Sequence, residues 1–354
     1  MTLEVQNNPS ITVIMSVYNC ENFVSEAINS ILNQTFTDFE FLIADDCSTD
    51  STRKIIDSFK DYRIKTIHNS KNIHLVETWN KLASYAKGKY ITFQDADDVS
   101  YVTRLEKLFN FAENNKNIAV VGANFYRPFK KWKMSTQSNY KLTHKDIIED
   151  LESNGIVNFY GTRALFRREI FNEFNGFRIF FNRVGWEDYD LFLRIAQKYP
   201  VANISDILYE YRYYKNSSSK VKKSNISFKK VFIHEIGLFL YHQRKNNNGL
   251  DGLMENGDKS GFEKCLIKLE NKYLSDISIS YRIMSKNQCS NKDFRNAIVS
   301  IGNALKLRPD ILSNWLLIPV FIKSIVKNYV AYWFFFFEFT IHKSSSKEVS
   351  QKVG

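Results

Sequence analysis

The first two-thirds of the 354-residue chain alternates short apolar runs with stretches of helical periodicity. ITVIMSVY (11–18) is a continuous β-rich run, as expected of a parallel strand that is buried on both faces. In the next segment, 22–33, the apolar residues recur at the spacing of one helical face. The predicted strands are 11–18, 39–44, 64–69, 90–94 and 118–123, and the predicted helices are 22–33, a helix carrying Ile55 and Phe59, 76–86 and 102–114.

Strands that alternate with helices of this length predict an α/β fold with a doubly wound, Rossmann-like, mostly parallel sheet. In such sheets, ligands bind at the carboxyl ends of the strands. Two acidic groups follow predicted strands: Asp45 with Asp46, and then Asp95, Asp97 and Asp98 in FQDADD. Carboxylates this close resist ionisation unless a cation or a hydrogen-bond donor balances them. The alternative for the second group is a solvated acidic loop without a functional role.

A carboxylate pair at a strand end suits a divalent cation that neutralises a diphosphate, because Mg²⁺ and Mn²⁺ prefer hard oxygen ligands. The chain contains neither GxxxxGK[ST] nor GxGxxG, so the sequence offers no glycine cradle for a phosphate. These features favour a nucleotide diphosphate held by a metal over the sites of kinases and dehydrogenases.

A third acidic cluster begins GWEDYDLFLRIAQ (185–197), where Glu187 and Asp188 occupy the first turn of a predicted helix. Acidic residues at a helix N-terminus have a purely structural explanation, because they complement the helix macrodipole. A carboxylate in this place can also face a cleft and accept a proton from an attacking hydroxyl. The segment alone leaves both interpretations open.

The C-terminal part differs from the rest in charge. Residues 1–217 hold 27 basic and 27 acidic residues, whereas residues 218–354 hold 22 and 11, so this part carries the whole net charge of +11. Nucleic acid and an anionic membrane surface are the candidate partners. The lysines are dispersed and carry no RNA-binding signature, so we expect no nucleic-acid partner.

The most apolar segment of this basic region is 311–343, which Pro319, Lys323 and Lys327 interrupt. One interpretation is a core helix that closes the domain. The other, which the basic surplus favours, is an in-plane membrane anchor. The remaining C-terminal segments predict helices, with DFRNAIVSIGNALKLRPD belonging to a helical hairpin.

Cysteine usage and the N-terminus bear on location. The four cysteines lie far apart without CxxC spacing, which argues against a zinc site and a disulfide framework and fits a reducing cytosol. The N-terminal residues show no basic n-region and no signal-length apolar stretch. We expect a cytoplasmic protein that is peripheral on the inner membrane.

Three motifs carry a family resemblance when taken in order. SVYNCENFVSEAINSILNQTFTDFEFLIADDCSTDST, FQDADD and GWEDYDLFLR resemble glycosyltransferase family 2 with the GT-A fold, of the inverting type found in bacterial glycan biosynthesis. A lone DxD is weak, whereas the ordered set is specific. The resemblance covers roughly residues 10–217, and it implies a transferase domain over 1–217 and a basic helical region over 218–354.

The resemblance also implies roles for individual residues. The nucleotide base would be held at Ser16 and Tyr18 and at the acid pair Asp45–Asp46, with Asp46 as the main contact to uracil. Ribose and the metal-bound diphosphate would be handled by Asp95 and Asp97, which are also the implied ligands of Mn²⁺ or Mg²⁺. Asp98 would lie at the edge shared by the metal and the donor sugar.

For the reaction, the resemblance implies that Asp188 is the catalytic base, with Glu187 beside it holding the acceptor. An acceptor hydroxyl on a glycan or a lipid-linked precursor would attack the anomeric carbon of a UDP-sugar and invert its configuration. The chain has no QxxRW motif, which marks processive synthases in this family. We therefore expect the transfer of a single sugar each time an acceptor binds. The alternative is a GT-A module that binds nucleotide sugar but has lost its chemistry.

The chain departs from the family pattern at three places. Cys47 stands where glycine is usual, which we expect to affect only a turn. Asn72-Ile73-His74 replaces the common N-x-G after the third strand, and His74 is either a substitute metal ligand or a surface residue. Tyr214 stands where many relatives have a histidine that completes the metal shell, so the third protein ligand is left open.

Overall fold

The computed structural model describes residues 8–129, 134–159, 161–212, 227–290 and 293–326. The chain forms two compact units, residues 1–217 with 233–263, and residues 218–232 with 264–354. Tyr214 and Lys327 lie outside the described residues, so the expectations about them stay predictions.

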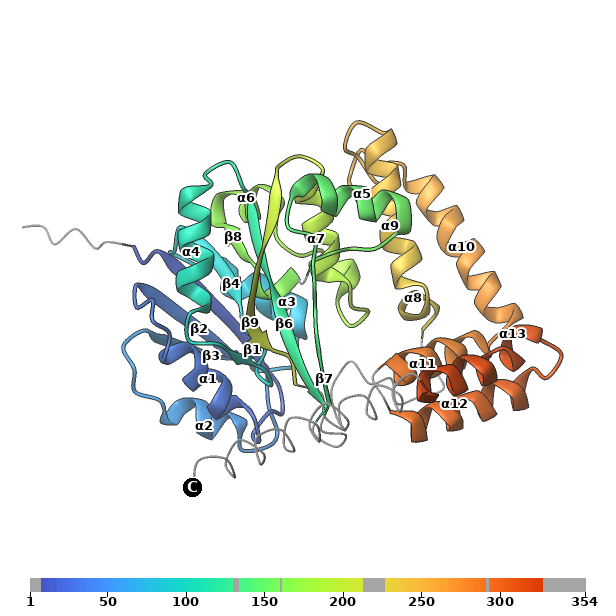
Figure 1. Ribbon diagram of the computed structural model, residues 1–354. Helices are drawn as coiled ribbons and strands as arrows, with labels where there is room; N and C mark the ends of the chain where they lie inside the picture. Colours follow the sequence, from blue (N-terminus) through green and yellow to red (C-terminus); the bar gives the residue numbers. More distant parts are fainter. Residues whose placement is uncertain (1–7, 130–133, 160, 213–226, 291–292, 327–354) are drawn as a thin grey trace, which may run out of the picture. The chain divides into compact units, whose positions relative to one another are not determined.

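The first unit is built on a single mixed sheet (Figure 1). Its strands are β1 (Ile11–Val17), β2 (Phe39–Asp45), β3 (Ile64–His68), β4 (Tyr90–Phe93), β5 (Val99–Ser100), β6 (Val120–Phe129), β7 (Met134–Gln137), β8 (Leu165–Arg167) and β9 (Val201–Glu210). The strand order is β3-β2-β1-β4-β8-β6-β9-β5, and β7 pairs with β6. The first four strands in this order are parallel to one another, which confirms the predicted α/β sheet.

The second half of the sheet differs from a simple parallel continuation. The run 118–123 does form β6, but β8 lies between it and β4 and is antiparallel to both. β6 and β9 are parallel, whereas β7 and β5 pair antiparallel with their neighbours. β8 has only three residues, too few for its apolar pattern to reveal a strand in the sequence.

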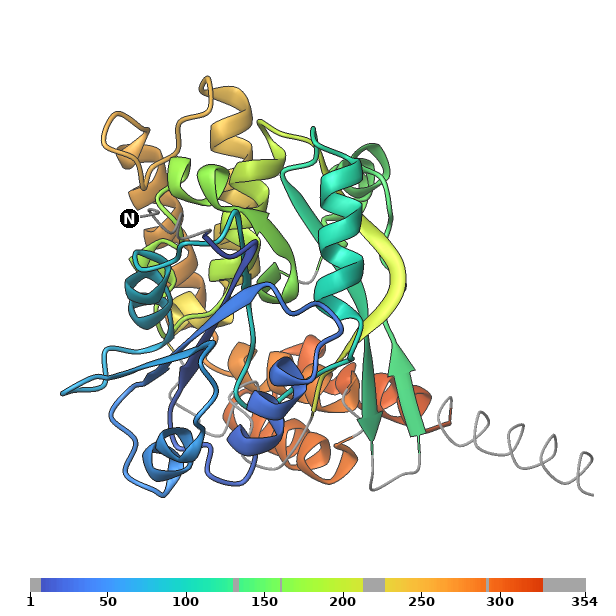
Figure 2. The same cartoon turned by 90° about the vertical axis from the view of Figure 1, so that its left-hand side faces the viewer.

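Helices cover both faces of this sheet. Those of its first part are α1 (Val24–Leu32), α2 (Thr52–Ser58), α3 (Leu75–Ala83), α4 (Arg104–Asn114), α5 (His144–Asn154), α6 (Arg168–Glu173) and α7 (Glu187–Ala196). Alternate residues of β1 pack with α1 and α4 in one buried cluster, and α3, α6 and α7 contribute to the other. Figure 2 shows α4 beside β6, with which it is in contact.

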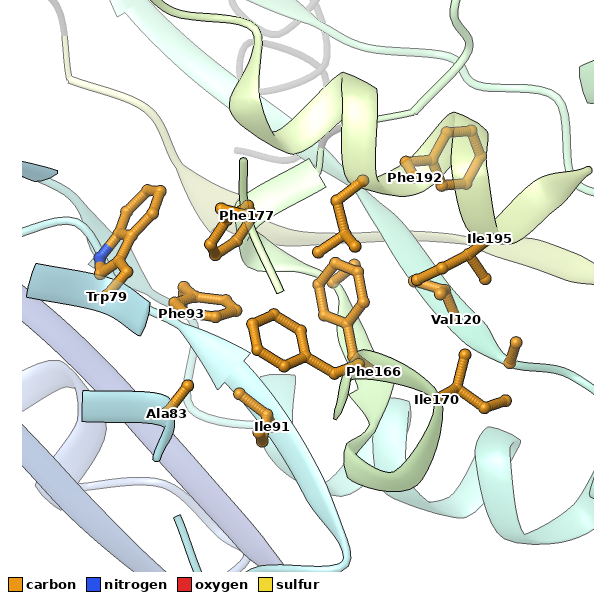
Figure 3. Packing of buried hydrophobic residues seen from close by; sticks show 14 of the residues in the cluster. Trp79, Ala83, Ile91, Phe93, Val120, Phe166, Ile170, Phe177, Phe192 and Ile195 are labelled. Carbon is orange, nitrogen blue, oxygen red and sulfur yellow. The ribbon is translucent and has the colours of Figure 1, made fainter. Parts of the chain in front are cut away.

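Aromatic packing fixes the end of β4, immediately before the acidic loop. The ring of Phe93 is fully buried, and its centroid lies 5.2 Å from that of Trp79 and 5.1 Å from that of Phe177. Phe166 meets Phe93 edge-on at 6.2 Å (Figure 3). Buried aromatic pairs stabilise beyond their area alone, so the acidic loop starts from a rigid strand end.

The C-terminal segments are helical, as predicted. They form α8 (Phe228–Val231), α9 (Ile233–Asn246), α10 (Lys259–Ser275), α11 (Ile279–Ser290), α12 (Phe294–Leu307) and α13 (Leu312–Trp315), and residues 317–326 are also helical. α11 and α12 pack on each other, which confirms the predicted helical hairpin. Among the described residues, every helix is too short or too polar to cross a bilayer.

Candidate active site

The topology brings the acidic groups to one edge of the sheet. The register pairs Val17 of β1 with Asp45 of β2, and the N–H of Asp46 donates to the carbonyl of Val17 at 2.8 Å. On the other side of β1, the N–H of Gln94 donates to the carbonyl of Ile14 at 2.9 Å. The loop that follows Asp46 and the loop that follows Gln94 therefore leave the sheet at neighbouring carboxyl ends, as the parallel strands predicted.

Asp95, Asp97 and Asp98 form a compact cluster. One carboxylate oxygen of each lies within 4.8 Å of the others, and in the part of the chain that the structure describes this is the group of acids that fits a shared metal ion. Asp98 is only 1% exposed, which rules out a simple solvated loop. The guanidinium of Arg163 donates to Asp95 and also to Asp98, at 2.6 Å from Asp98 Oδ2.

The electrostatics of Asp98 follow from this environment. Burial raises the pKa of Asp98 to about 7, while the Arg163 charge opposes the rise and the carboxylates of Asp97 and Asp95 add to it. A divalent cation would relieve the same repulsion, and three carboxylates supply the hard oxygen donors that Mg²⁺ or Mn²⁺ prefers. The residues present therefore fit such an ion.

Two further arginines hold the acidic loop in place. Arg104 is 1% exposed, and its Nη2 donates to the carbonyls of Phe93 at 2.9 Å and Arg163 at 3.0 Å. Arg212 donates its backbone N–H to Asp98 Oδ1 at 2.8 Å and its Nε to the carbonyl of Asp97 at 2.6 Å. Neither arginine was predicted from the sequence, although Arg212 lies only two residues before Tyr214, which departs from the family pattern.

The carboxylate of Asp46 is hydrogen-bonded to the loop that follows β3. It accepts from Asn69 Nδ2 at 2.8 Å and from the backbone N–H groups of Ile73 at 3.0 Å and His74 at 2.8 Å. Asp46 is 2% exposed, so it fixes the loop that follows β3. Asp45 is equally buried and accepts from the N–H of Ser48 at 3.2 Å. Recognition of uracil by this pair stays a prediction.

The other residues predicted to hold the nucleotide base are more exposed to solvent than Asp45 and Asp46. Ser16 at the end of β1 is half-buried, and Tyr18 is 48% exposed. Cys47 has φ 65°, in the left-handed region that favours glycine, which explains why glycine is usual at this turn. His74 bonds through Nε2 to Arg183 at 2.5 Å, and it is not part of the carboxylate group that fits a metal.

The carboxyl group of Asp188 interacts electrostatically with Arg163 and with Asp95 of the acidic cluster. α7 begins at Glu187, and the Oδ1 of Asp188 accepts from the N–H of Tyr189 at 2.8 Å. Burial raises the pKa of Asp188 to about 6, with Arg163 opposing the rise and Asp95 adding to it. A carboxyl group with such a pKa ionises near neutral pH and can accept a proton there.

Gly161 permits the position of Asp188. A Cβ added to this glycine would lie 2.5 Å from the Cβ and 2.9 Å from the Cγ of Asp188. Gly161 and Arg163 belong to the same 3-10 turn (Gly161–Arg163), so one short segment contacts Asp188 at one end and the acidic cluster at the other.

Comparisons with known sequences show to which family the chain is similar. The sequence model of "Glycosyl transferase family 2" matches residues 12–174. The "Putative glycosyltransferase EpsE" of Bacillus subtilis (strain 168) is 31% identical over 216 residues, covering 59% of this chain and 74% of that protein. The chain belongs to glycosyltransferase family 2. The family predicted from the three motifs is therefore confirmed, and the chain is a transferase enzyme.

Two further proteins are similar to this transferase, one over a shorter stretch of sequence and the other in structure at low sequence identity. The "UDP-Glc:alpha-D-GlcNAc-diphosphoundecaprenol beta-1,3-glucosyltransferase WfgD" of Escherichia coli is 35% identical over 115 residues, covering 32% of this chain and 45% of that protein. Among solved structures, Staphylococcus aureus TarS 1-349 in complex with UDP-GlcNAc is 17% identical with a TM-score of 0.54, covering 90% of this chain and 89% of that chain. This second likeness supports the predicted fold.

Proposed function

We propose that residues 1–217 form an inverting transferase domain that moves one sugar from a UDP-sugar to a hydroxyl group of a glycan or lipid-linked acceptor. The observation that carries the proposal is the shared segment Gly161–Arg163, which contacts Asp188 and bonds to Asp95 and Asp98. A donor held by the acidic cluster would thus have a carboxylate of raised pKa near its reacting carbon.

In this mechanism Asp188 accepts the proton of the acceptor hydroxyl, whose oxygen attacks the anomeric carbon from the face opposite the diphosphate. Glu187, the first residue of α7, orients the acceptor. Asp95 and Asp97 would hold the divalent ion, Mn²⁺ or Mg²⁺, which would supply positive charge to the diphosphate of the leaving UDP. Ser16, Tyr18, Asp45 and Asp46 hold the nucleotide base.

The proposed donor and acceptor classes draw on two proteins that are similar to this chain. TarS was crystallised with UDP-GlcNAc, and WfgD uses UDP-Glc on a diphosphoundecaprenol-linked sugar. These two proteins favour a uridine nucleotide and a lipid-linked acceptor for this transferase as well. The two names include different donor sugars, so the test must cover several UDP-sugars.

The test is a calorimetric titration of a panel of UDP-sugars and GDP-mannose, with Mn²⁺ present, followed by assay of UDP release. We expect binding selective for one UDP-sugar, and slow release of UDP as water replaces the acceptor. GDP-mannose serves as the control for the base. Binding of no uridine nucleotide would contradict the proposal, and binding without any UDP release under acceptor-rich conditions would favour the lapsed module.

We also propose that residues 218–354 bind the anionic cytoplasmic face of the inner membrane. Large apolar side chains near the described C-terminal end are exposed, among them Leu312 at 71%, Trp315 at 50%, Leu316 at 54% and Ile322 at 53%. An exposed apolar group beside lysines suits the boundary between lipid head groups and acyl chains.

Flotation with vesicles tests the membrane proposal. The full chain is expected to float with vesicles that contain phosphatidylglycerol, and not with phosphatidylcholine alone, because basic residues add attraction to anionic lipid. Replacing Leu312 and Leu316 with serine is expected to weaken flotation. Replacing Ile156 and Ile179 with serine, at exposed apolar sites outside residues 218–354, is the matched control. Equal flotation of all variants, or binding to RNA in place of vesicles, would contradict it.

A further inference from the structure

The guanidinium of Arg163 lies against the carboxylate cluster that is the proposed metal site. It bonds to Asp95 Oδ2 and to Asp98 Oδ2, two of the three carboxylates whose oxygens lie within 4.8 Å of one another. Arg163 is only 8% exposed, so this contact is shielded from solvent. A shielded arginine on a carboxylate pair is a strong, geometrically specific interaction.

Several contacts hold Arg163 in this position. Its guanidinium carbon lies 4.6 Å from the ring centroid of Tyr209 and 5.4 Å from that of Tyr211. Its backbone carbonyl accepts from Nη2 of the buried Arg104 at 3.0 Å. Both the backbone and the head group of the side chain are therefore fixed, and the positive charge is part of the cluster as folded.

This arrangement leaves little of Asp98 for a metal. Its Oδ2 accepts from Arg163, and its Oδ1 accepts from the backbone N–H of Arg212 at 2.8 Å. Asp95 offers one of its two oxygens to Arg163. A divalent ion at this cluster must therefore displace Arg163 or bind beside a positive charge, and either event weakens ion binding.

We propose that Arg163 is a positioning residue that keeps the metal affinity of the nucleotide-free site low. The diphosphate brings two negative charges, which offset the presence of Arg163, so the ion and the nucleotide bind together. The proposal rests on the proposed function for the identity of the nucleotide, whereas the effect of Arg163 on the ion alone does not depend on it. Mutual strengthening of ion and nucleotide binding follows from linkage.

The experiment is a calorimetric titration of MnCl₂ into the full chain without nucleotide. Arg163→Gln is expected to bind Mn²⁺ about tenfold or more tightly than the wild type, because one nearby positive charge is removed. Arg163→Lys keeps the charge but has no fork to bridge two carboxylates, and it is expected to bind with an intermediate affinity. Arg295→Gln removes a positive charge at an exposed site of α12, outside the transferase domain, and it should match the wild type.

A second titration in the presence of saturating UDP completes the test. UDP should strengthen Mn²⁺ binding to the wild type by a larger factor than to Arg163→Gln. Circular dichroism melting reports whether the variants fold, and if Arg163→Gln does not, the lysine variant decides. The inference is wrong if folded variants bind Mn²⁺ no more tightly than the wild type, since Arg163 would then be only structural. Absence of UDP binding to the wild type would instead contradict the proposed function.

Discussion

Asp188→Asn is expected to lower the rate of sugar transfer by about 10²–10⁴-fold, the range contributed by a general base. Asparagine is nearly isosteric and its Oδ1 can still accept from the N–H of Tyr189, so the start of α7 should be preserved. Affinity for UDP should stay close to that of the wild type, because Asp188 is assigned to the acceptor proton and not to the nucleotide. Single-turnover transfer and calorimetric UDP binding measure the two effects separately.

The pH dependence gives the same assignment a second test. The base acts in its ionised form, and burial raises the pKa of Asp188 to about 6. Transfer should therefore fall as the pH drops through about 6 and level off above it, and Asp188→Asn should lack this limb. Near wild-type turnover in the asparagine variant, or an unchanged acidic limb, would show that another group takes the proton.

Gly161→Ala probes the same carboxylate without altering it. The new Cβ would lie 2.5 Å from the Cβ of Asp188, so Asp188 or the turn must move. Transfer should fall while UDP binding persists, because misplacement of a base is costly even when the base is present. Gly302→Ala in α12, where an added Cβ meets nothing within 4 Å, is the matched control and should retain full activity.

The strands and the acidic groups could be predicted because they depend on local pattern. Continuous apolar runs such as 11–18 mark buried strands, and parallel topology brings the strand ends that precede Asp46 and Asp95 to one edge. β8 could not be predicted, since a three-residue strand has no period of its own. It is part of the sheet because it forms backbone hydrogen bonds with β4 on one side and with β6 on the other.

The arginines of the site were missed for a different physical reason. Arginine is mostly found at surfaces, so nothing local distinguishes a buried arginine from an exposed one. Arg163 meets Asp95 across 68 positions of the chain, and Arg212 meets Asp98 across 114. Their burial is a property of the tertiary fold. The available signal was the uncompensated acidity of FQDADD, which required donors from elsewhere.

Asp251→Ala is expected to lower the free energy of unfolding by about 3–5 kcal/mol, the cost of leaving a buried charge without its partner. Asp251 is fully buried and accepts from Arg178 at 2.8 Å and from Arg244 at 2.5 Å. Both arginines also approach the buried Asp190 of α7, at 3.4 and 3.7 Å. Removing Asp251 therefore leaves Arg178, Arg194 and Arg244 with Asp190 as their shared acid in this network of the first unit.

This ion network supports the helix that carries the proposed base. Asp190 lies in the first turn of α7, two residues after Asp188, and bonds to Arg194 at 2.9 Å. Arg244 belongs to α9, which packs against α7. Loss of Asp251 is therefore expected to loosen the contact between α9 and α7, and to reduce transfer as well as stability.

Urea unfolding as a function of pH measures the effect of Asp251. Burial opposes its ionisation, but Arg178 and Arg244 hold the pKa of Asp251 below its ordinary value. A depressed carboxyl pKa contributes stability above the unfolded pKa, and this contribution is lost as the pH falls through the folded pKa. The deficit of Asp251→Ala should accordingly be largest near neutral pH and shrink below about pH 4, the ordinary range of an aspartate.

The exposed pair of Arg308 and Asp310, which are 2.7 Å apart, provides the matched control for Asp251→Ala. Asp310→Ala removes an acid of the same kind from an arginine that remains in water, so little change in stability is expected. Both variants lose one negative charge, but the loss of Asp251 removes two buried arginine contacts and that of Asp310 removes one exposed contact. The comparison therefore measures the cost of removing an acid from a buried network against that of removing one from an exposed pair. If the two variants were equally stable, water must reach Arg178 and Arg244 once Asp251 is gone, and the network would not be what holds α7 in place.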